Sequence, residues 1–197
     1  WRKPALIRAV FFDLGDTLVV EESVGNKHLW EVTLKKVPDL DEVLTELKNR
    51  GYKLGIITNT VVSREEHVRM ALRKIDIEKY FDVIVASVDI GFNKPDERIF
   101  LVALKAVNVK PEEGVMVGNR ISTDILGGNR VGMKTILYKW NERYPDRIMS
   151  LQEKPDRTIT NSCIRCHGGS SDDLDLLPKT CLLKRIDRVL DLTKRDR

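Results

Sequence analysis

No long hydrophobic run occurs in this sequence, and none of its apolar stretches approaches the roughly 20 residues that a membrane-spanning helix needs. The first residues also lack the basic segment, apolar run and small residues of an export signal. A strong excess of one charge is missing too, because 34 Lys and Arg residues are set against 30 Asp and Glu residues, for a net charge of +4. We therefore expect a cytoplasmic protein without a membrane partner, and the interspersed charges do not indicate a nucleic-acid partner.

Cysteine is equally scarce, and the three cysteines, Cys163, Cys166 and Cys181, all lie in one segment near the C-terminal end. The rest of the composition is that of a globular protein, with 42% hydrophobic and 32% charged residues in a chain of 197. This length suits one domain with a real core and a small appendage.

Apolar runs and amphipathic segments alternate along the first 160 residues. Near-continuous apolar runs predict strands at 9–12, 52–58, 83–86, 115–117 and 135–138. Between them, helices are predicted to begin at Asp39 and Ser63, each with a glutamate three residues on as a capping box, at Asp96, and over 122–130. Strands that alternate with helices pair in parallel through right-handed crossovers, so the pattern predicts an α/β fold, a doubly wound three-layer α/β/α sandwich.

Polar side chains follow the predicted strands at the point where each strand ends. Asp13 follows the first strand, Thr58 and Asn59 end the second, Lys94 lies in the loop after the third, and Asp124 follows the fourth. Because the carboxyl ends of parallel strands meet at one edge of a sheet, we expect these residues to converge there. Each residue has a structural alternative, such as a turn or a helix start. Polar residues after four successive strands nevertheless favour a site.

The chemistry of this set is that of phosphoryl transfer. Asp13 would attack phosphorus to give an aspartyl phosphate that water then hydrolyses, while Thr58 and Asn59 would bind phosphate oxygens. Lys94 would offset the negative charge of nucleophile and phosphate, and Asp124 would help to hold a hard cation, most simply Mg²⁺, through oxygen ligands. The partner expected from these residues is a phosphorylated substrate.

Four stretches together resemble the haloacid dehalogenase superfamily. They are, in order, Phe12-Asp13-Leu14-Gly15-Asp16-Thr17-Leu18, Gly55-Ile56-Ile57-Thr58-Asn59, Asn93-Lys94-Pro95-Asp96-Glu97-Arg98-Ile99-Phe100, and Val117-Gly118-Asn119 through Asp124-Ile125. The resemblance extends from about residue 7 to residue 159, where Thr158-Ile159 is similar to the last strand of the family. It implies a Rossmann-like core, an aspartate nucleophile and, usually, Mg²⁺-dependent phosphate hydrolysis.

The sequence departs from the family at two positions. Gly15 stands where phosphatases of the family usually carry the Asp that acts as general acid and base, a group typically worth about 10²- to 10⁴-fold in rate. The neighbouring Asp16 could substitute if the loop turns its side chain inward, and the Gly15 carbonyl could still bind the metal. Asn119 replaces a metal-ligating Asp, so Mg²⁺ should bind through Asp13, Gly15, Asn119 and Asp124 but more weakly.

These departures leave three functional hypotheses open. The first is a weak phosphatase that acts on acyl or aryl phosphates, whose leaving groups are stable anions and need no acid. The second is a catalytically weak or inactive binding or scaffold module. The third, less favoured, is a dehalogenase, since displacement of halide needs neither acid nor metal.

The sequence also predicts how the chain is divided. Residues 1–160 form the hydrolase core, and within it the connection 19–37 is long enough only for a short flap, which predicts an open site suited to a bulky substrate or closed by a second copy of the chain. Residues 161–181 are predicted to be a Cys-containing insertion or loop, and 182–197 a C-terminal helix and tail. Zinc binding by the three cysteines, a disulfide and free thiols all stay open. The Cys163-Ile164-Arg165-Cys166-His167 match to a haem attachment pattern is disfavoured because nothing signals export.

Overall fold

A computed structural model describes residues 5–20, 27–139, 141, 143–145 and 147–160 of the chain. The predictions for the cysteine segment and the C-terminal helix lie outside these residues. The described part contains one six-stranded sheet in the order β3-β2-β1-β4-β5-β6, and each neighbouring pair of strands is parallel. Its strands are β1 (Ala9–Phe12), β2 (Lys53–Thr58), β3 (Val83–Ala86), β4 (Gly114–Gly118), β5 (Lys134–Lys139) and β6 (Arg157–Thr160). The predicted parallel α/β fold is confirmed.

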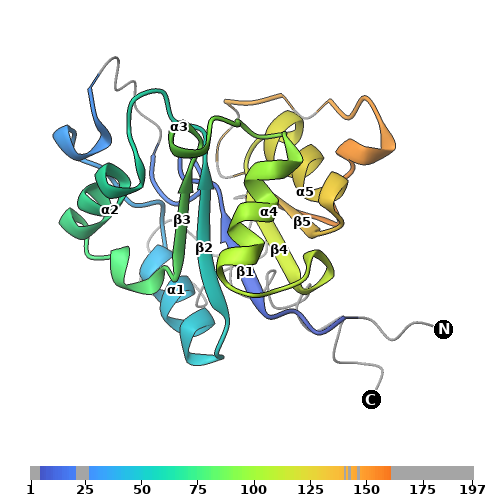
Figure 1. Cartoon of the computed structure of the whole chain (residues 1–197), viewed down its shortest axis with the longest axis horizontal. Helices are drawn as coiled ribbons and strands as arrows, with labels where there is room; N and C mark the ends of the chain where they lie inside the picture. The colour runs from blue at the N-terminus through green and yellow to red at the C-terminus, as the bar shows by residue number, and fades with distance from the viewer. Residues whose placement is uncertain (1–4, 21–26, 140, 142, 146, 161–197) are drawn as a thin grey trace, which may run out of the picture.

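Helices cover both faces of this sheet (Figure 1). The α-helices are α1 (Leu40–Asn49), α2 (Glu65–Lys74), α3 (Ser87–Ile90), α4 (Glu97–Ala106) and α5 (Leu126–Val131). Short 3₁₀ helices are η1 (Leu29–Glu31), η2 (Glu78–Tyr80), η3 (Pro111–Glu113) and η5 (Leu151–Glu153), and a π-helical turn, η4 (Ile121–Ile125), precedes α5. The fourth predicted helix, 122–130, is therefore π-helical in its first turn.

The alternation of side chains along β1 creates two separate cores. Val10 and Phe12 point to the face covered by α1 and α2, where they pack in one apolar cluster with side chains such as Leu44 of α1 and Leu72 of α2. Phe11 points to the opposite face and packs in a second cluster with residues of α4 such as Phe100. Because β1 is buried on both sides, the residue that follows it is held on a rigid strand end.

Asp39 is the N-cap residue of α1 as predicted, but the predicted side-chain capping fails at both Asp39 and Ser63. The Asp39 side chain makes no capping hydrogen bond, and its backbone is left-handed with φ of 61°. The residue before α2 is Arg64 rather than Ser63, whose hydroxyl instead accepts a hydrogen bond from the Leu29 amide at 2.9 Å. Asp96 is confirmed as a cap, because its carboxylate accepts from the Arg98 amide.

The connection between β1 and α1 forms a short flap, whose described residues are 19–20 and 27–37. Its two ends run side by side, with the Val20 amide donating to the Lys35 carbonyl at 2.8 Å and the Val37 amide to the Leu18 carbonyl at 3.0 Å. Between these ends η1 packs against α2 and is held there by the Leu29 to Ser63 hydrogen bond. The flap thus stands beside the carboxyl ends of the strands. No helix in the described part of the chain is long and apolar enough to cross a bilayer.

Candidate functional site

Asp13 lies directly after β1, in the centre of the sheet. Its backbone amide donates to the carbonyl of Val117 in β4 at 2.9 Å, which extends the β1–β4 ladder by one bond and fixes the residue where the strand stops. The residue is only 8% exposed. An aspartate so placed is held rigidly at the edge where parallel α/β sheets bind their ligands.

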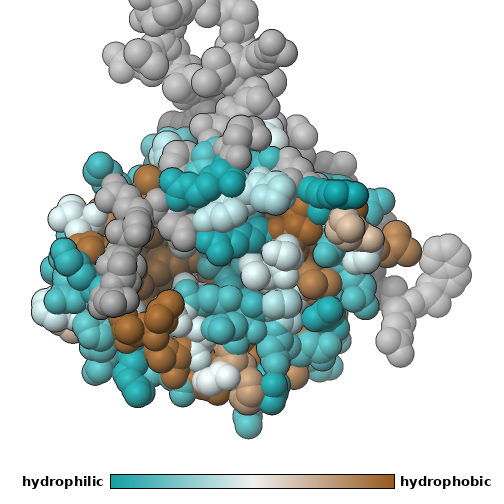
Figure 2. Space-filling model, turned by 90° about the horizontal axis from the view of Figure 1, so that it is seen from above, coloured by the Kyte–Doolittle hydropathy of each residue, from teal (hydrophilic) through white to brown (hydrophobic). Residues whose placement is uncertain are grey.

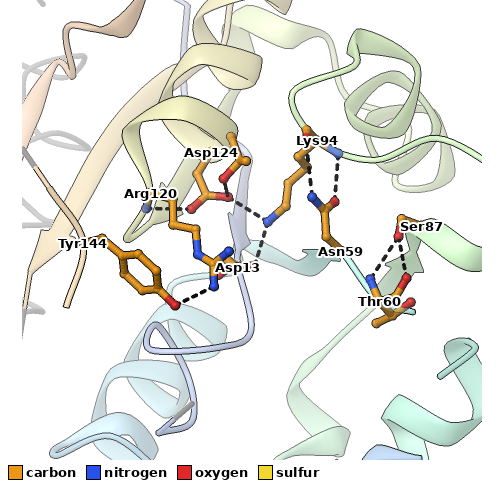
Figure 3. A network of polar contacts seen from close by, with 9 residues as sticks. Asp13, Asn59, Thr60, Ser87, Lys94, Arg120, Asp124 and Tyr144 are labelled. Carbon is orange, nitrogen blue, oxygen red and sulfur yellow. Dashed lines mark hydrogen bonds and ion pairs between the residues drawn. The ribbon is translucent and has the colours of Figure 1, made fainter. Parts of the chain in front are cut away.

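Lys94 joins two of the predicted site residues into one cluster (Figure 3). Its Nζ lies 2.6 Å from Asp13 Oδ1 and 2.7 Å from Asp124 Oδ1. All three side chains are buried, with those of Lys94 and Asp124 at 2% and 0% exposure. The structure therefore brings together residues that lie 81 and 30 positions apart in the sequence.

The charges of this cluster influence one another. Burial raises the pKa of Asp13 from 3.8 to about 6, even though the Lys94 ammonium acts in the opposite direction. Burial by itself would lower the pKa of Lys94, but the carboxylates of Asp124 and Asp13 outweigh it and hold that pKa above its usual value. Lys94 therefore stays charged while Asp13 is the group that titrates near neutrality.

Asn59 fixes the position of Lys94. Its side-chain Oδ1 accepts from the Lys94 amide at 2.8 Å, and its Nδ2 donates to the Lys94 carbonyl at 3.1 Å, so both ends of the amide grip the main chain of one residue. The sequence predicted a substrate-binding role for Asn59. In the structure the residue also has a positioning role, which sequence spacing did not reveal because the two residues lie 35 positions apart.

The oxygen-rich groups beside Asp13 suit a hard cation. Asn119 is 7% exposed, and neither its Oδ1 nor its Nδ2 has a hydrogen-bond partner within the described part of the protein. A buried amide without partners is costly, which is consistent with a ligand at this point. Gly118 leaves room for Asp124, since a Cβ on Gly118 would lie 2.3 Å from Asp124 Oδ2. The donor chemistry of Asp13, Asn119 and Asp124 thus fits Mg²⁺.

Asp16 is oriented differently from Asp13. Its backbone is left-handed, with φ of 52°, and its side chain is fully buried and pairs with Arg143 Nη1 at 2.9 Å through Oδ2. Asp16 is not among the described residues that line the cavity above Asp13, whereas Gly15 is. Its carboxylate therefore links the loop after β1 to the chain beyond β5, and its predicted acid–base role stays a hypothesis.

A cavity of about 280 Å³ opens above Asp13. The polar residues of its floor include four that the sequence predicted, Asp13, Thr58, Asn59 and Lys94, together with Gly15. Thr58 is 4% exposed at the end of β2 and lines this cavity, and its phosphate-binding role stays a prediction. Most of the remaining lining comes from the flap and from the loop after β2, and the rest follows β1 and β4. Four predicted residues from separate strand ends therefore share one cavity, whereas Asn119 and Asp124 are not among the described residues that line it.

The sequence missed two further residues of this site. Arg120 lines the cavity, and its Nη2 donates to the Tyr144 hydroxyl at 2.5 Å while its guanidinium stacks 4.2 Å from the centre of the Tyr144 ring (Figure 3). The position of Arg120 next to Asn119 was the available signal. Tyr144 carried none, because the chain after β5 has no motif that places it near the site.

A buried aspartate, lysine and second aspartate at the carboxyl edge of a parallel sheet suit the class of α/β proteins that carry out hydrolysis with a carboxylate. Within that class the family is also shown by sequence, because residues 11–138 match the model of the haloacid dehalogenase-like hydrolases. The chain belongs to this family.

Several known proteins are similar to the chain. A glyceraldehyde 3-phosphate phosphatase of Pyrococcus furiosus is 39% identical over 129 residues, which cover 64% of this chain and 51% of the relative. One of the same name from Methanothermobacter thermautotrophicus is 35% identical and covers 67% of this chain and 57% of the relative. The chain thus spans about half the length of the curated relatives it matches. A crystal structure of a Listeria monocytogenes serotype 4b protein superposes with a TM-score of 0.68 at 27% identity, and covers 96% of this chain and 99% of that one.

Proposed function

We propose that the protein is a Mg²⁺-dependent phosphatase that acts through a phosphorylated Asp13. The single observation that carries this proposal is the placement of Asp13, which ends the central strand at the floor of a cavity with the Lys94 ammonium 2.6 Å from its carboxylate. The names of the relatives agree, since they include glyceraldehyde 3-phosphate phosphatase and ribulose-1,5-bisphosphate 5-phosphatase.

In the proposed reaction an Asp13 oxygen forms a bond to phosphorus, and the bond from phosphorus to the leaving-group oxygen breaks with its electron pair on that oxygen. Water then attacks the phosphorus of the aspartyl phosphate, which releases phosphate and restores the Asp13 carboxylate. Lys94 holds the nucleophile in place and offsets charge on the transferring group, while Thr58 donates its hydroxyl to a phosphate oxygen.

Mg²⁺ would be held by Asp13, Asn119, Asp124 and the Gly15 carbonyl, and when bound it would neutralise charge on the phosphoryl oxygens. Asn119 supplies an oxygen without a charge, so this set carries two carboxylates rather than three. We propose that it binds Mg²⁺ weakly for that reason.

The decisive experiment measures phosphate release from para-nitrophenyl phosphate with Mg²⁺. We expect release that EDTA abolishes and that Asp13→Asn reduces by at least about 10³-fold, because the amide is not a nucleophile. Asp76→Asn is the matched control, since Asp76 is an exposed left-handed residue far from the site and should leave the rate unchanged. Release that survives Asp13→Asn would contradict the proposal.

A binding or scaffold module is the second candidate, and Gly15 is the observation that favours it, because a phosphatase with no acid at this position has lost a large rate factor. Its expected signature is binding of phosphate with Mg²⁺, seen by calorimetry, without turnover of para-nitrophenyl phosphate. Chloride release from a small haloacid, independent of Mg²⁺, would instead reveal the dehalogenase.

The role of Asp16 is tested by the choice of leaving group. A general acid is needed most by alkyl phosphates, so if Asp16 has this role, Asp16→Asn should slow an alkyl phosphate far more than an aryl phosphate. If Asp16 only holds Arg143, Asp16→Asn and Arg143→Gln should slow both substrates by similar factors. We also propose that the enzyme is cytoplasmic. A second copy of the chain is proposed as one means of closing the site, and the sedimentation of the protein tests whether it forms a dimer.

A further inference from the structure

The cavity above Asp13 has two chemically different parts. Its floor carries the charged and polar groups of the site, whereas its walls are largely aliphatic. Apart from Leu14, which follows β1, the aliphatic side chains come from the flap and from the loop after β2, and they are Val19, Val20, Leu29, Val32, Leu34, Val61 and Val62. Figure 2 looks down on this end of the sheet and shows apolar surface gathered on the side where Figure 1 places the flap.

The aliphatic wall is unusual for a surface that would meet a sugar phosphate. Hydroxyl groups pressed against valine and leucine lose water without gaining partners, which costs free energy. The polar members of the flap wall, Lys27 and Thr33, are exposed, and the polar groups of Thr60, Arg120 and Thr123 belong to other parts of the lining. The Ser63 hydroxyl is already engaged by the Leu29 amide at 2.9 Å. The wall therefore favours an apolar group on the substrate.

The floor makes a second and independent demand on the leaving group. Among the described residues that line the cavity, Asp13 is the one carboxylate, and Gly15, two residues further along the chain, has no side chain. Because no second carboxylic acid lies among these described lining residues to donate a proton, they favour a leaving oxygen that departs as a stable anion. Oxygens attached to aromatic rings meet this demand, whereas those of ordinary alkyl alcohols do not.

We propose, resting on the phosphatase activity proposed above, that the substrates are aryl phosphates with an apolar ring, and that Leu29, Val32 and Leu34 of the flap bind this ring. Asp13 bonds to phosphorus as the aryl oxygen leaves with the electron pair, and no proton is transferred in that step. Water then hydrolyses the aspartyl phosphate and its protons remain on the released phosphate. The overall reaction converts an aryl phosphate and water to an aryloxide ion and dihydrogen phosphate.

Four substrates separate the preference for an apolar group from the need for a stable leaving anion. The wild-type protein with Mg²⁺ is assayed for phosphate release from 1-naphthyl phosphate (apolar, stable anion), 2-phenylethyl phosphate (apolar, unstable anion), acetyl phosphate (small, stable anion) and glycerol 1-phosphate (polar, unstable anion). We expect kcat/KM to be greatest for 1-naphthyl phosphate, with acetyl phosphate limited by a high KM and 2-phenylethyl phosphate by a low kcat.

Variants test which residues bind the apolar ring and which position determines the need for a stable leaving group. Val32→Thr keeps the shape of the wall but adds a hydroxyl, and should raise KM for 1-naphthyl phosphate about three- to tenfold while acetyl phosphate is unaffected. Val102→Thr on the exposed face of α4 is the matched control and should change neither. Gly15→Asp should raise kcat for 2-phenylethyl phosphate by roughly 10²-fold or more and have a much smaller effect on 1-naphthyl phosphate.

The outcomes keep the two proposals apart. If none of the four substrates releases phosphate, the phosphatase function fails and the substrate class fails with it. If glycerol 1-phosphate is hydrolysed with a kcat/KM equal to or above that of 1-naphthyl phosphate, the phosphatase stands and the aryl specificity is overturned. Unchanged acetyl phosphate turnover in Val32→Thr shows that this variant is folded, so an unchanged KM for 1-naphthyl phosphate would also overturn the assignment of the flap.

Discussion

The cluster of Asp13, Lys94 and Asp124 combines two carboxylates with one ammonium, so it carries a net charge of −1 in a buried place. Such a cluster attracts a cation and resists full ionisation. The raised pKa of Asp13, about 6, expresses that resistance, because burial favours the protonated acid. With this pKa, Asp13 is mostly a carboxylate at neutral pH. Its carboxylate form is replaced by the protonated acid as the pH drops below about 6.

The ionisation of Asp13 predicts an acid limb in the rate. The carboxylate is the reactive form, so kcat should decline tenfold per pH unit below the pKa of Asp13, which is about 6 without metal and which bound Mg²⁺ would lower. Phosphate esters also titrate in this region, and the control is therefore a pair of substrates whose own phosphate pKa values differ. A limb that stays at one pH for both substrates belongs to the enzyme, whereas a limb that moves with the substrate contradicts this assignment.

The amide of Asn119 predicts a metal site that can be improved. Asn119→Asp adds a negative charge beside two carboxylates, and we expect the Kd for Mg²⁺ to fall by about tenfold or more, measured by isothermal titration calorimetry. Asn108→Asp is the matched control, because Asn108 is exposed at the end of α4 and should leave the Kd unchanged. Equal Mg²⁺ affinity in wild type and Asn119→Asp would show that Asn119 lies outside the metal's coordination.

At the scale of the element, close packing on β2 is the most exacting constraint. A Cβ on Gly55 would lie 2.6 Å from Phe11 Cδ1 and 2.8 Å from Val83 Cγ1. Gly55→Ala should therefore lower the free energy of unfolding by about 1–3 kcal/mol. Gly114→Ala on β4 is the comparison, since its Cβ would meet two side-chain ends at 3.0 and 3.1 Å and the Pro111 carbonyl oxygen at an ordinary 3.4 Å, and the substitution should cost less than about 1 kcal/mol. Urea unfolding of both variants measures the difference, and equal losses would refute it.

The elements themselves were largely predictable from the sequence, because strands of a parallel sheet are buried on both faces and therefore appear as apolar runs. The predicted strands at 9–12 and 83–86 have the observed bounds. The start of a helix was harder to predict. Asp96 caps α4 as its residue type suggests, while Ser63 gives its hydroxyl to the flap, a contact 34 positions away that competes with the local cap. Long-range partners therefore decide what local propensity leaves open.

The same distinction holds for the candidate site. Asp13 and Lys94 follow strand ends, and strand ends converge in any parallel sheet, so their meeting was predictable from order alone. The Asp16 to Arg143 pair was not predictable, because it depends on the path of the chain after β5. The apolar wall of the cavity was also missed, since the flap was expected only to be short and its fold over Ser63 follows from one hydrogen bond.

For the molecule as a whole, the buried charge of Asp13 lowers the stability of the folded protein. The folded-state pKa of Asp13 lies above the ordinary value of 3.8, so the ionised residue opposes folding, and stability falls as pH rises from about 4 to about 6. Asp13→Asn removes this charge and keeps an oxygen that can accept from Lys94. At pH 8 without metal, we expect its thermal midpoint to rise by about 2–4 °C.

Differential scanning calorimetry measures this rise, and Asp76→Asn again serves as control because that carboxylate is exposed. Added Mg²⁺ should raise the thermal midpoint of the wild-type protein more than that of Asp13→Asn, since the metal neutralises the charge that the variant lacks. A lower midpoint for Asp13→Asn in metal-free buffer would show that the Asp13 to Lys94 pair stabilises the fold.

The strand order has a consequence for how the chain acquires its structure. β1 pairs on one side with β2, whose register aligns Ala9 with Lys53, and on the other with β4, which aligns Ala9 with Gly114. Neither neighbour is local, so loops of some forty and one hundred residues must close before the central strand is enclosed, and their closure costs entropy early. Folding should therefore be slow relative to that of helical proteins of this size. During synthesis β1 leaves the ribosome before the other described strands, and it can pair fully only after both β2 and β4 have followed.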